Sequence, residues 1–350
     1  MKILVIFTGG TIGSTVGENF ISLDDSKKYA LIDNFNKNTN LKVDFDIETP
    51  YSILSENLSG EELTTLCKLV ESKVSSGYDG IIVTHGTDTI QYTASALAYT
   101  VKTQIPILLV SANYPLDNDK SNGNDNFLGA VEFINQCKTK GVFVSYRNIS
   151  AGDVEFFPAN RILTHLEGKH KLYSIDGIPC ALYAKPNMVI SSALNFANSV
   201  IVFEEATPIT GKGAIGSVEF VSNPKILFIN SHPADSFDYN LKGYNAVLIK
   251  PYHSGTLDTA NKNFTEFCKK AKENNIPIFI PNVNGGISYE STKTFNELSL
   301  TVLPYSAIPA IYVKIWIAIS IGADIKEFVL EELNGEFLNK TEQELKKCKH

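Results

Sequence analysis

The sequence lacks the cysteine patterns that mark disulfide frameworks and structural metal sites. Its five cysteines are far apart and include no Cys-x-x-Cys pair; they are Cys67, Cys137, Cys180, Cys268 and Cys348. An odd number of scattered cysteines without metal-ligand spacing indicates reduced thiols. We therefore expect a cytoplasmic protein that holds neither a metal ion nor another cofactor.

Long apolar segments are also missing. After Met1 and Lys2 the chain has only five apolar residues before a Gly-Gly loop, which is too short for a signal peptide. The most apolar later stretch, 307–323, is interrupted by Pro309 and Lys314 and is short for a membrane span. We therefore expect a buried helix there and no membrane partner.

Basic runs and nucleotide-binding glycine motifs are absent as well. The net charge of −7, without a run of lysines or arginines, argues against a broad nucleic-acid surface. No Gly-x-Gly-x-x-Gly follows a strand and no Gly-Lys-Ser/Thr phosphate loop is present, so a nicotinamide-dependent dehydrogenase is disfavoured. With 43% hydrophobic and 20% charged residues, the composition is that of a globular protein rather than a disordered one.

What the sequence does contain is an alternation of strand-like and helical patterns, which is typical of βαβ units and parallel sheets. With 350 residues there is room for two α/β domains. We predict an N-terminal domain at 1–190, with a largely parallel sheet flanked by helices. A linker at 191–222 and a smaller C-terminal parallel-sheet domain at 223–350 follow.

One segment shows the alternation clearly. Ser59 followed by Glu62 has the form of a capping box, and leucines and valines then recur at helical spacing up to Val74. A strand is expected at 81–83, with the next helix beginning near Asp88. The polar segment 118–126 has no apolar period and is predicted to be a loop. Further strands are expected at 105–110, 141–145, 225–230, 246–250 and 276–280, and a helix at 261–273.

Two threonine-rich loops carry the chemical signal. Thr8-Gly9-Gly10-Thr11-Ile12-Gly13 follows an apolar strand, and Thr84-His85-Gly86-Thr87-Asp88-Thr89 follows another. Ligands of open α/β sheets bind beyond the carboxyl ends of strands, where such loops gather. A threonine there can act as a nucleophile if a neighbour activates it, although hydroxyls and carboxylates at helix starts often only cap the helix.

The two motifs together resemble the signatures of bacterial-type L-asparaginases (asparaginase I-like). The resemblance covers most of the chain and is strongest in residues 1–112. It implies that Thr11 is the nucleophile that attacks the side-chain amide. It further implies that Thr87 belongs to a proton-transfer group and that Asp88 holds the α-amino group of the substrate.

The resemblance also implies a set of substrate-binding residues. Ser55 matches a serine that binds the substrate carboxylate, with Glu56 beside it, and Asn57 stands where the family has aspartate. The 111–113 segment matches the place of a backbone carbonyl that faces the substrate. Ser254 matches a residue that reaches the site of a neighbouring subunit. The expected binding residues are thus Gly10, Ser55, Glu56, Gly86, Ala112 and Ser254.

The chain departs from the family pattern at two positions. A tyrosine that helps to activate the first threonine aligns with Phe20, and Tyr29 is the nearest residue that could replace it. A lysine that acts with the second threonine aligns with Arg161, which stays protonated and therefore cannot accept a proton. Lys169 and Lys171 are alternative counterparts of this lysine.

The resemblance favours an amidohydrolase that converts L-asparagine to L-aspartate and ammonia as a homodimer or homotetramer. Backbone amides of the first loop could stabilise the oxyanion. One alternative is a weak or inactive homologue that only binds asparagine or aspartate, as the two departures suggest. Another is the amidase of a tRNA-dependent amidotransferase, against which we weigh the acidic charge and the absence of an extra N-terminal domain.

Overall fold

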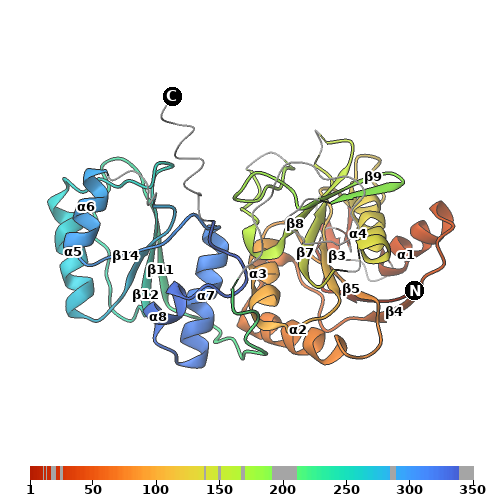
Figure 1. The fold of residues 1–350 in the computed structure, drawn as a ribbon, viewed down its shortest axis with the longest axis horizontal. Coiled ribbons are helices and arrows are strands. Elements are labelled where there is room, and N and C mark those ends of the chain that lie inside the picture. Colours follow the sequence, from red (N-terminus) through yellow and green to blue (C-terminus); the bar gives the residue numbers. More distant parts are fainter. Residues whose placement is uncertain are drawn as a thin grey trace.

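The chain folds into two α/β units, each built on its own sheet (Figure 1). The computed structural model describes residues 1–10, 12, 14–16, 21–23, 27–137, 139–148, 151–166, 170–190, 211–283 and 289–338. The fold class predicted from the sequence is confirmed, with a large helix-flanked sheet and a smaller parallel one. In this part of the chain no helix is long and apolar enough to span a bilayer.

The larger unit contains an eight-stranded sheet in the order β10-β9-β8-β7-β6-β5-β1-β4. The strands from β4 to β7 in this order pair in parallel, whereas β8, β9 and β10 are antiparallel. The strands are β1 (Lys2–Phe7), β4 (Asp44–Glu48), β5 (Gly80–Thr84), β6 (Pro106–Val110), β7 (Gly141–Tyr146), β8 (Val154–Pro158), β9 (Ala181–Ala184) and β10 (Asn187–Ile190); a separate pair comprises β2 (Ser14–Val16) and β3 (Ile21–Leu23).

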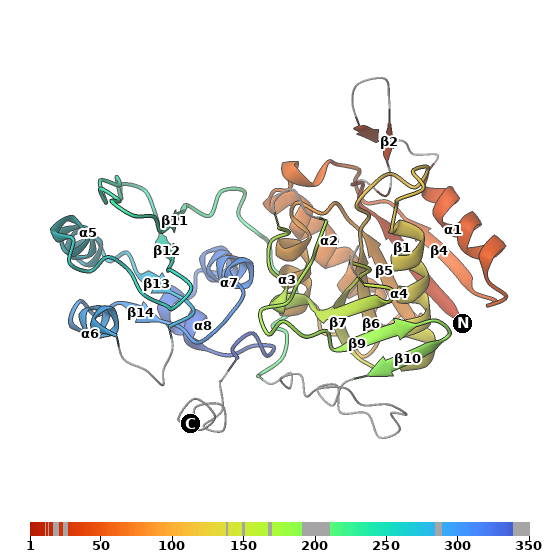
Figure 2. The same ribbon diagram turned by 90° about the horizontal axis from the view of Figure 1, so that it is seen from above.

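Both faces of this sheet are covered, because alternate side chains of a strand point to opposite faces. On β1, Leu4 and Ile6 join one apolar core with α2 and α3, and Ile3 and Val5 join the other with α1 and α4. Figure 2 shows these two helix pairs on opposite sides of the sheet. The helices are α1 (Lys27–Asn38), α2 (Gly60–Lys73), α3 (Ile90–Thr100) and α4 (Gly123–Cys137), with short 3₁₀ turns η2 (Ser55–Asn57) and η3 (Ala159–Arg161).

The smaller unit is a four-stranded parallel sheet in the order β11-β12-β13-β14. The apolar segment expected to form a buried helix does so as α7, with Pro309 in its first turn. The elements are β11 (Ile226–Asn230), β12 (Ala246–Lys250), β13 (Ile278–Ile280), β14 (Thr301–Val302), α5 (Lys262–Glu273), α6 (Glu290–Glu297), α7 (Ile308–Ile321) and α8 (Ile325–Leu330).

The two units are joined by packing and by a C-terminal segment that returns to the larger one. Val313 and Trp316 of α7 belong to the same apolar core as α3. The 333–337 segment contacts the larger unit, where Asn160 donates to the Asn334 carbonyl and the Arg161 guanidinium to the Gly335 carbonyl. The predicted linker lies largely outside the described residues, which resume at 211.

Two local predictions differ from the structure. The predicted loop at 118–126 contains the first turn of α4, which begins at Gly123. The second loop extends farther than expected, because α3 begins at Ile90 rather than near Asp88. Both differences occur at helix starts, where Asn, Asp, Thr and Gly serve equally well in loops and at helix ends.

Candidate active site

The candidate site lies where the strand order of the large sheet reverses. From β1 the chain leads to β4 on one side, whereas β5, β6 and β7 continue on the other. The carboxyl ends of β1 and β5 are therefore adjacent at a topological switch point, where open α/β sheets bind ligands. The two threonine loops leave the sheet at these two strand ends.

The two loops touch through their glycines. Gly10 has φ +77°, and a β-carbon there would lie 2.3 Å from the Gly86 nitrogen and 2.6 Å from its α-carbon. Only glycine permits such a backbone contact at this φ. At the strand ends, the Thr8 hydroxyl donates a 2.6 Å hydrogen bond to the Thr84 carbonyl. The structure thus brings Gly10 and Gly86 of the predicted site together.

A third segment, the 3₁₀ turn η2, lies against the second loop. A β-carbon on Gly86 would lie 2.4 Å from the hydroxyl oxygen of Ser55, which is buried in η2. The Thr89 hydroxyl donates to the Ser55 carbonyl at 2.7 Å, and the Gly10 amide donates to the Ile53 carbonyl at 3.1 Å. Ser55 therefore contacts the second loop. Its neighbour Glu56 is exposed.

His85 fixes the conformation of the second loop. Its Nδ1 lies 2.8 Å from the Gly86 carbonyl and must carry the proton, so Nε2 accepts the 2.8 Å hydrogen bond from the Thr93 hydroxyl. Burial lowers the pKa of this imidazole to about 4, against a small opposing effect of the Gly86 carbonyl. His85 is therefore neutral at neutral pH, and both of its nitrogens are occupied.

Thr87 and Asp88 are more accessible to solvent than the buried residues His85 and Gly86 that precede them. Thr87 is half-buried and Asp88 is exposed, directly before the first turn of α3. Neither side chain forms a hydrogen bond or an ion pair with the residues that the structure describes. The Asp88 carbonyl accepts a hydrogen bond from Gln91, which holds the backbone at this point. Within the described part of the chain, neither side chain is therefore engaged by the fold.

The β6 end adds buried polar atoms without partners. Ala112 is buried, as are its neighbours Ser111 and Asn113. The Ser111 hydroxyl and the Asn113 Nδ2 have no hydrogen-bond partner among the described residues. The backbone of Asn113 is nevertheless well fixed. Its backbone amide donates to the Asn122 Oδ1 at 2.9 Å, and the backbone amide of Asn122 donates to the Asn113 Oδ1 at 2.9 Å. Buried polar groups are nearly always satisfied, so these atoms need a partner other than the described residues.

His165 is a half-buried residue of the larger unit that the sequence motifs do not predict. It lies on a hairpin that begins at the Ile162–Ser174 bridge and continues with the Leu163 amide donating to the Tyr173 carbonyl at 2.8 Å. Burial lowers the pKa of its imidazole to about 4. No motif surrounds His165, so only the register of the hairpin reveals its position.

Other predicted site residues are not at the loops. Arg161 is fully buried at the base of that hairpin; its Nε donates to the Gly335 carbonyl at 2.7 Å, and its Nη1 lies 3.5 Å from an Asp176 carboxylate oxygen. Tyr29 is 60% exposed on α1. Ser254 lies in the smaller unit after β12, where its hydroxyl is 3.0 Å from that of Thr256. These contacts account for the burial of Arg161 by a structural role.

Three residues of the predicted site lie outside the described part of the chain. These residues are the expected nucleophile Thr11, Phe20 and one alternative lysine, Lys169. The other alternative, Lys171, lies on the hairpin next to His170. Among the described residues no group of His, Cys, Asp and Glu is arranged to hold a metal ion.

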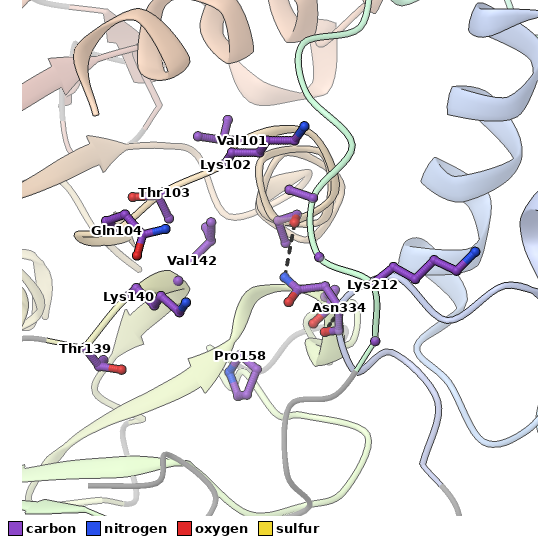
Figure 3. Close-up of a pocket in the computed structure, with 16 residues that line it drawn as sticks. Val101, Lys102, Thr103, Gln104, Thr139, Lys140, Val142, Pro158, Lys212 and Asn334 are labelled. Carbon is purple, nitrogen blue, oxygen red and sulfur yellow. Dashed lines mark hydrogen bonds between the residues drawn. The ribbon is translucent and has the colours of Figure 1, made fainter. Parts of the chain in front are cut away.

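The large cavity in Figure 3 is a different place. It has a volume of about 630 Å³ and is lined by Lys102, Lys140, Lys212 and Asn334, among others. These residues adjoin the amino ends of β6 and β7, the opposite edge of the sheet from the threonine loops. We therefore do not assign the reaction to this cavity.

The geometry above agrees with the comparison with known proteins. The family model described as "Asparaginase, N-terminal" matches residues 2–161, which contain both loops and η2. This part of the chain is thus similar to the N-terminal domain of asparaginases. Two solved asparaginases have the same overall fold. The thermostable L-asparaginase from Thermococcus kodakarensis superposes with a TM-score of 0.78 at 19% identity, covering 97% of this chain and 100% of that one. L-asparaginase I from Vibrio cholerae gives 0.76 at 19% identity, covering 97% and 99%.

Curated proteins similar in sequence to this chain carry a different name. A glutamyl-tRNA(Gln) amidotransferase subunit from Methanococcus vannielii is 27% identical over 335 residues, covering 90% of this chain and 73% of the relative. Its counterpart from Methanobrevibacter smithii is 32% identical over 132 residues, covering 37% of this chain and 30% of the relative. The latter match thus spans less than a third of that relative's length.

Proposed function

We propose that this protein is an amidohydrolase that hydrolyses the side-chain amide of L-asparagine to L-aspartate and ammonia. The contact between Gly10 and Gly86 is the observation that carries the proposal. It joins the two threonine loops at the carboxyl edge of the sheet, with Ser55 beside them. A small amino acid carries charges of both signs, which the Asp88 carboxylate and the loop amides and hydroxyls suit.

In the proposed reaction the Thr11 hydroxyl attacks the amide carbon and ammonia leaves, after which water releases the aspartate. Backbone amides of the first loop stabilise the oxyanion, and Ala112 faces the substrate with its carbonyl. Ser55 and Glu56 bind the substrate carboxylate end, and Asp88 binds its α-amino group. These roles follow the family resemblance.

Ammonia release from purified protein tests the proposal. With L-asparagine we expect turnover that falls at least about 100-fold in Thr11→Ala and in Thr87→Ala, because each removes a reacting or proton-transferring hydroxyl. Thr103→Ala is the matched control, since this threonine lies in the turn before β6 at the opposite edge of the sheet. A wild-type rate no higher than that of Thr11→Ala would contradict the hydrolase proposal.

The same assay separates the alternatives. An inactive homologue would bind L-aspartate in calorimetry without releasing ammonia. The amidase of a tRNA-dependent amidotransferase is favoured by the long match to the amidotransferase relative from Methanococcus vannielii. In that case, ammonia release would depend on a tRNA-binding partner protein. Turnover of free L-asparagine at the same rate with and without such a partner would exclude it.

We also propose that the protein acts in the cytoplasm as a homodimer or homotetramer, in which Ser254 reaches a neighbouring site. Its position after β12, in the smaller unit, is compatible with a contribution to another protomer. Light scattering after size exclusion measures the assembly. A monomer with full activity would contradict the proposal.

A further inference from the structure

Two buried asparagines at the start of α4 hold the loop that carries Ala112. Asn122 directly precedes the helix, and Asn126 lies one turn later, with its amide donating to the Asn122 carbonyl at 2.9 Å. Residues four apart in a helix are neighbours on one face, so the two side chains leave the helix on the same side. Neither asparagine belongs to the motifs that predicted the site.

Each asparagine joins the loop after β6 to the residue after β7, and the two do so with opposite polarity. The Asn122 Oδ1 accepts from the Asn113 amide at 2.9 Å, and its Nδ2 donates to the Arg147 carbonyl at 2.9 Å. The Asn126 Nδ2 donates to the Ser111 carbonyl at 2.8 Å, and its Oδ1 accepts from the Arg147 amide at 2.6 Å. Exchanging oxygen and nitrogen in either side chain would break both of its bonds, so each orientation is fixed. We call Asn122 and Asn126 the asparagine brace.

The asparagine brace fixes the direction of the Ala112 carbonyl. In a trans peptide unit, the carbonyl of one residue and the amide N–H of the next point in opposite directions. The peptide between Ala112 and Asn113 is trans, and the Asn113 amide points at Asn122. The Ala112 carbonyl therefore points away from Asn122. The preceding peptide unit is held as well, through the bond from Asn126 to the Ser111 carbonyl.

The carbonyl that the brace fixes is not used by the fold. Ala112 is only 1% exposed, yet no described residue donates a hydrogen bond to its carbonyl. Buried backbone carbonyls are usually paired, so this oxygen needs a partner from outside the described residues. It lies beside the second threonine loop, because the His85 amide donates at 2.8 Å to the carbonyl of Val110, two residues before Ala112.

We propose that Asn122 and Asn126 are positioning residues: they hold the Ala112 carbonyl so that it accepts a hydrogen bond from the side-chain amide nitrogen of L-asparagine. This proposal rests on the proposed hydrolase function, in which Asp88 takes the α-amino group and leaves the side-chain amide as the other N–H donor of the substrate. L-aspartate has a carboxylate oxygen in place of that nitrogen, with no hydrogen to donate. The brace therefore favours the amide substrate over its product.

Steady-state kinetics of Asn126→Asp and Asn122→Asp test the positioning, because an ionised aspartate accepts hydrogen bonds but donates none. Asn126→Asp loses the bond to the Ser111 carbonyl, whereas Asn122→Asp keeps the acceptor for the Asn113 amide. Selectivity is the inhibition constant of L-aspartate divided by KM for L-asparagine. We expect it to fall about 10-fold in Asn126→Asp and to stay within about 3-fold of wild type in Asn122→Asp. Equal losses would overturn the proposal, since a merely structural role would affect both variants alike.

Asn124→Ala is the matched control for activity. Asn124 lies on the same turn of α4, but its side chain contacts Asn34 of α1 at 3.3 Å instead of the loop after β6. We expect both its kcat and its selectivity to stay within about 2-fold of wild type. A loss of selectivity in Asn124→Ala as large as that in Asn126→Asp would overturn the assignment to the brace.

Amide hydrogen exchange, followed by nuclear magnetic resonance, tests the brace without any activity measurement. Asn122→Ala removes the acceptor of the Asn113 amide, so exchange of that amide should become at least about 10-fold faster, whereas the amide of Ile82 within β5 should keep its rate. Unchanged exchange at Asn113 would overturn the brace. If wild type releases no ammonia, the hydrolase proposal fails, while this measurement still decides the brace. Should Asn122→Ala fail to fold, the comparison of the two aspartate variants decides it.

Discussion

At the scale of single residues, the contact between Gly10 and Gly86 offers a sharp test. Gly10→Ala would place a β-carbon 2.3 Å from a backbone nitrogen at φ +77°, whereas Gly77 has φ +79° with nothing within 4 Å. We expect Gly77→Ala to cost about 1–2 kcal/mol, from conformation alone. Gly10→Ala should lower the free energy of unfolding by about 1–3 kcal/mol more than Gly77→Ala does. It should also abolish ammonia release, because the added β-carbon forces the two loops apart. Urea unfolding of both variants measures this; equal losses would contradict the close contact.

Acid sensitivity also belongs to this scale. The pKa of buried His85 is about 4 in the folded protein, against an ordinary value of 6.5. As the pH is lowered, His85 of the unfolded chain therefore binds a proton at a higher pH than His85 of the folded protein. The free energy of unfolding consequently falls between about pH 6.5 and pH 4, by about 3 kcal/mol for this residue. Above pH 7 the contribution is fully present. Thermal unfolding of His85→Gln should show a shallower loss over this window, with the remaining slope due partly to His165. An unchanged slope would contradict the assignment.

At the scale of elements, the capping box at the start of α2 is confirmed. The Glu61 amide donates to the Ser59 hydroxyl oxygen at 3.2 Å, and the Ser59 amide donates to the Glu62 carboxylate at 3.0 Å. Ser59→Ala should destabilise the protein by about 1 kcal/mol in chemical unfolding. Ser72→Ala, on the exposed face of the same helix, should change it by less than about 0.5 kcal/mol. Equal effects of the two variants would argue against the cap.

How much the sequence can predict depends on whether a signal is local. Apolar periodicity and caps are local, and they predicted α2, β5, β12 and the buried α7 correctly. The contact of Gly10 with Gly86 was expected only from the family resemblance and the shared sheet edge. The position of His165 depends on the register of a hairpin and on its packing against Tyr146. Such contacts join residues far apart in the sequence, so no local pattern predicts them.

At the scale of the whole molecule, one buried ion pair holds the C-terminal segment. The Lys314 ammonium of α7 pairs with the Glu336 carboxylate, which also accepts from the Asn334 amide at 2.8 Å; both charged side chains are fully buried. Burial lowers the pKa of Lys314 although Glu336 opposes this. Lys314→Met should cost about 3–5 kcal/mol in unfolding experiments, because it leaves an unpaired buried carboxylate. Lys314→Met with Glu336→Gln should recover part of this loss; no recovery would contradict the pairing.

The return of the C-terminal segment affects how the protein is made. Asn160 and Arg161 find their carbonyl partners 174 residues later in the chain, at Asn334 and Gly335. While a ribosome is still synthesising the smaller unit, the buried guanidinium of the larger one lacks this partner. The larger sheet can therefore form early during translation, but its last buried contacts must wait until residue 335 has emerged from the ribosome. A stalled nascent chain that exposes residues only up to 330 should accordingly resist proteolysis less than one that exposes residues up to 338.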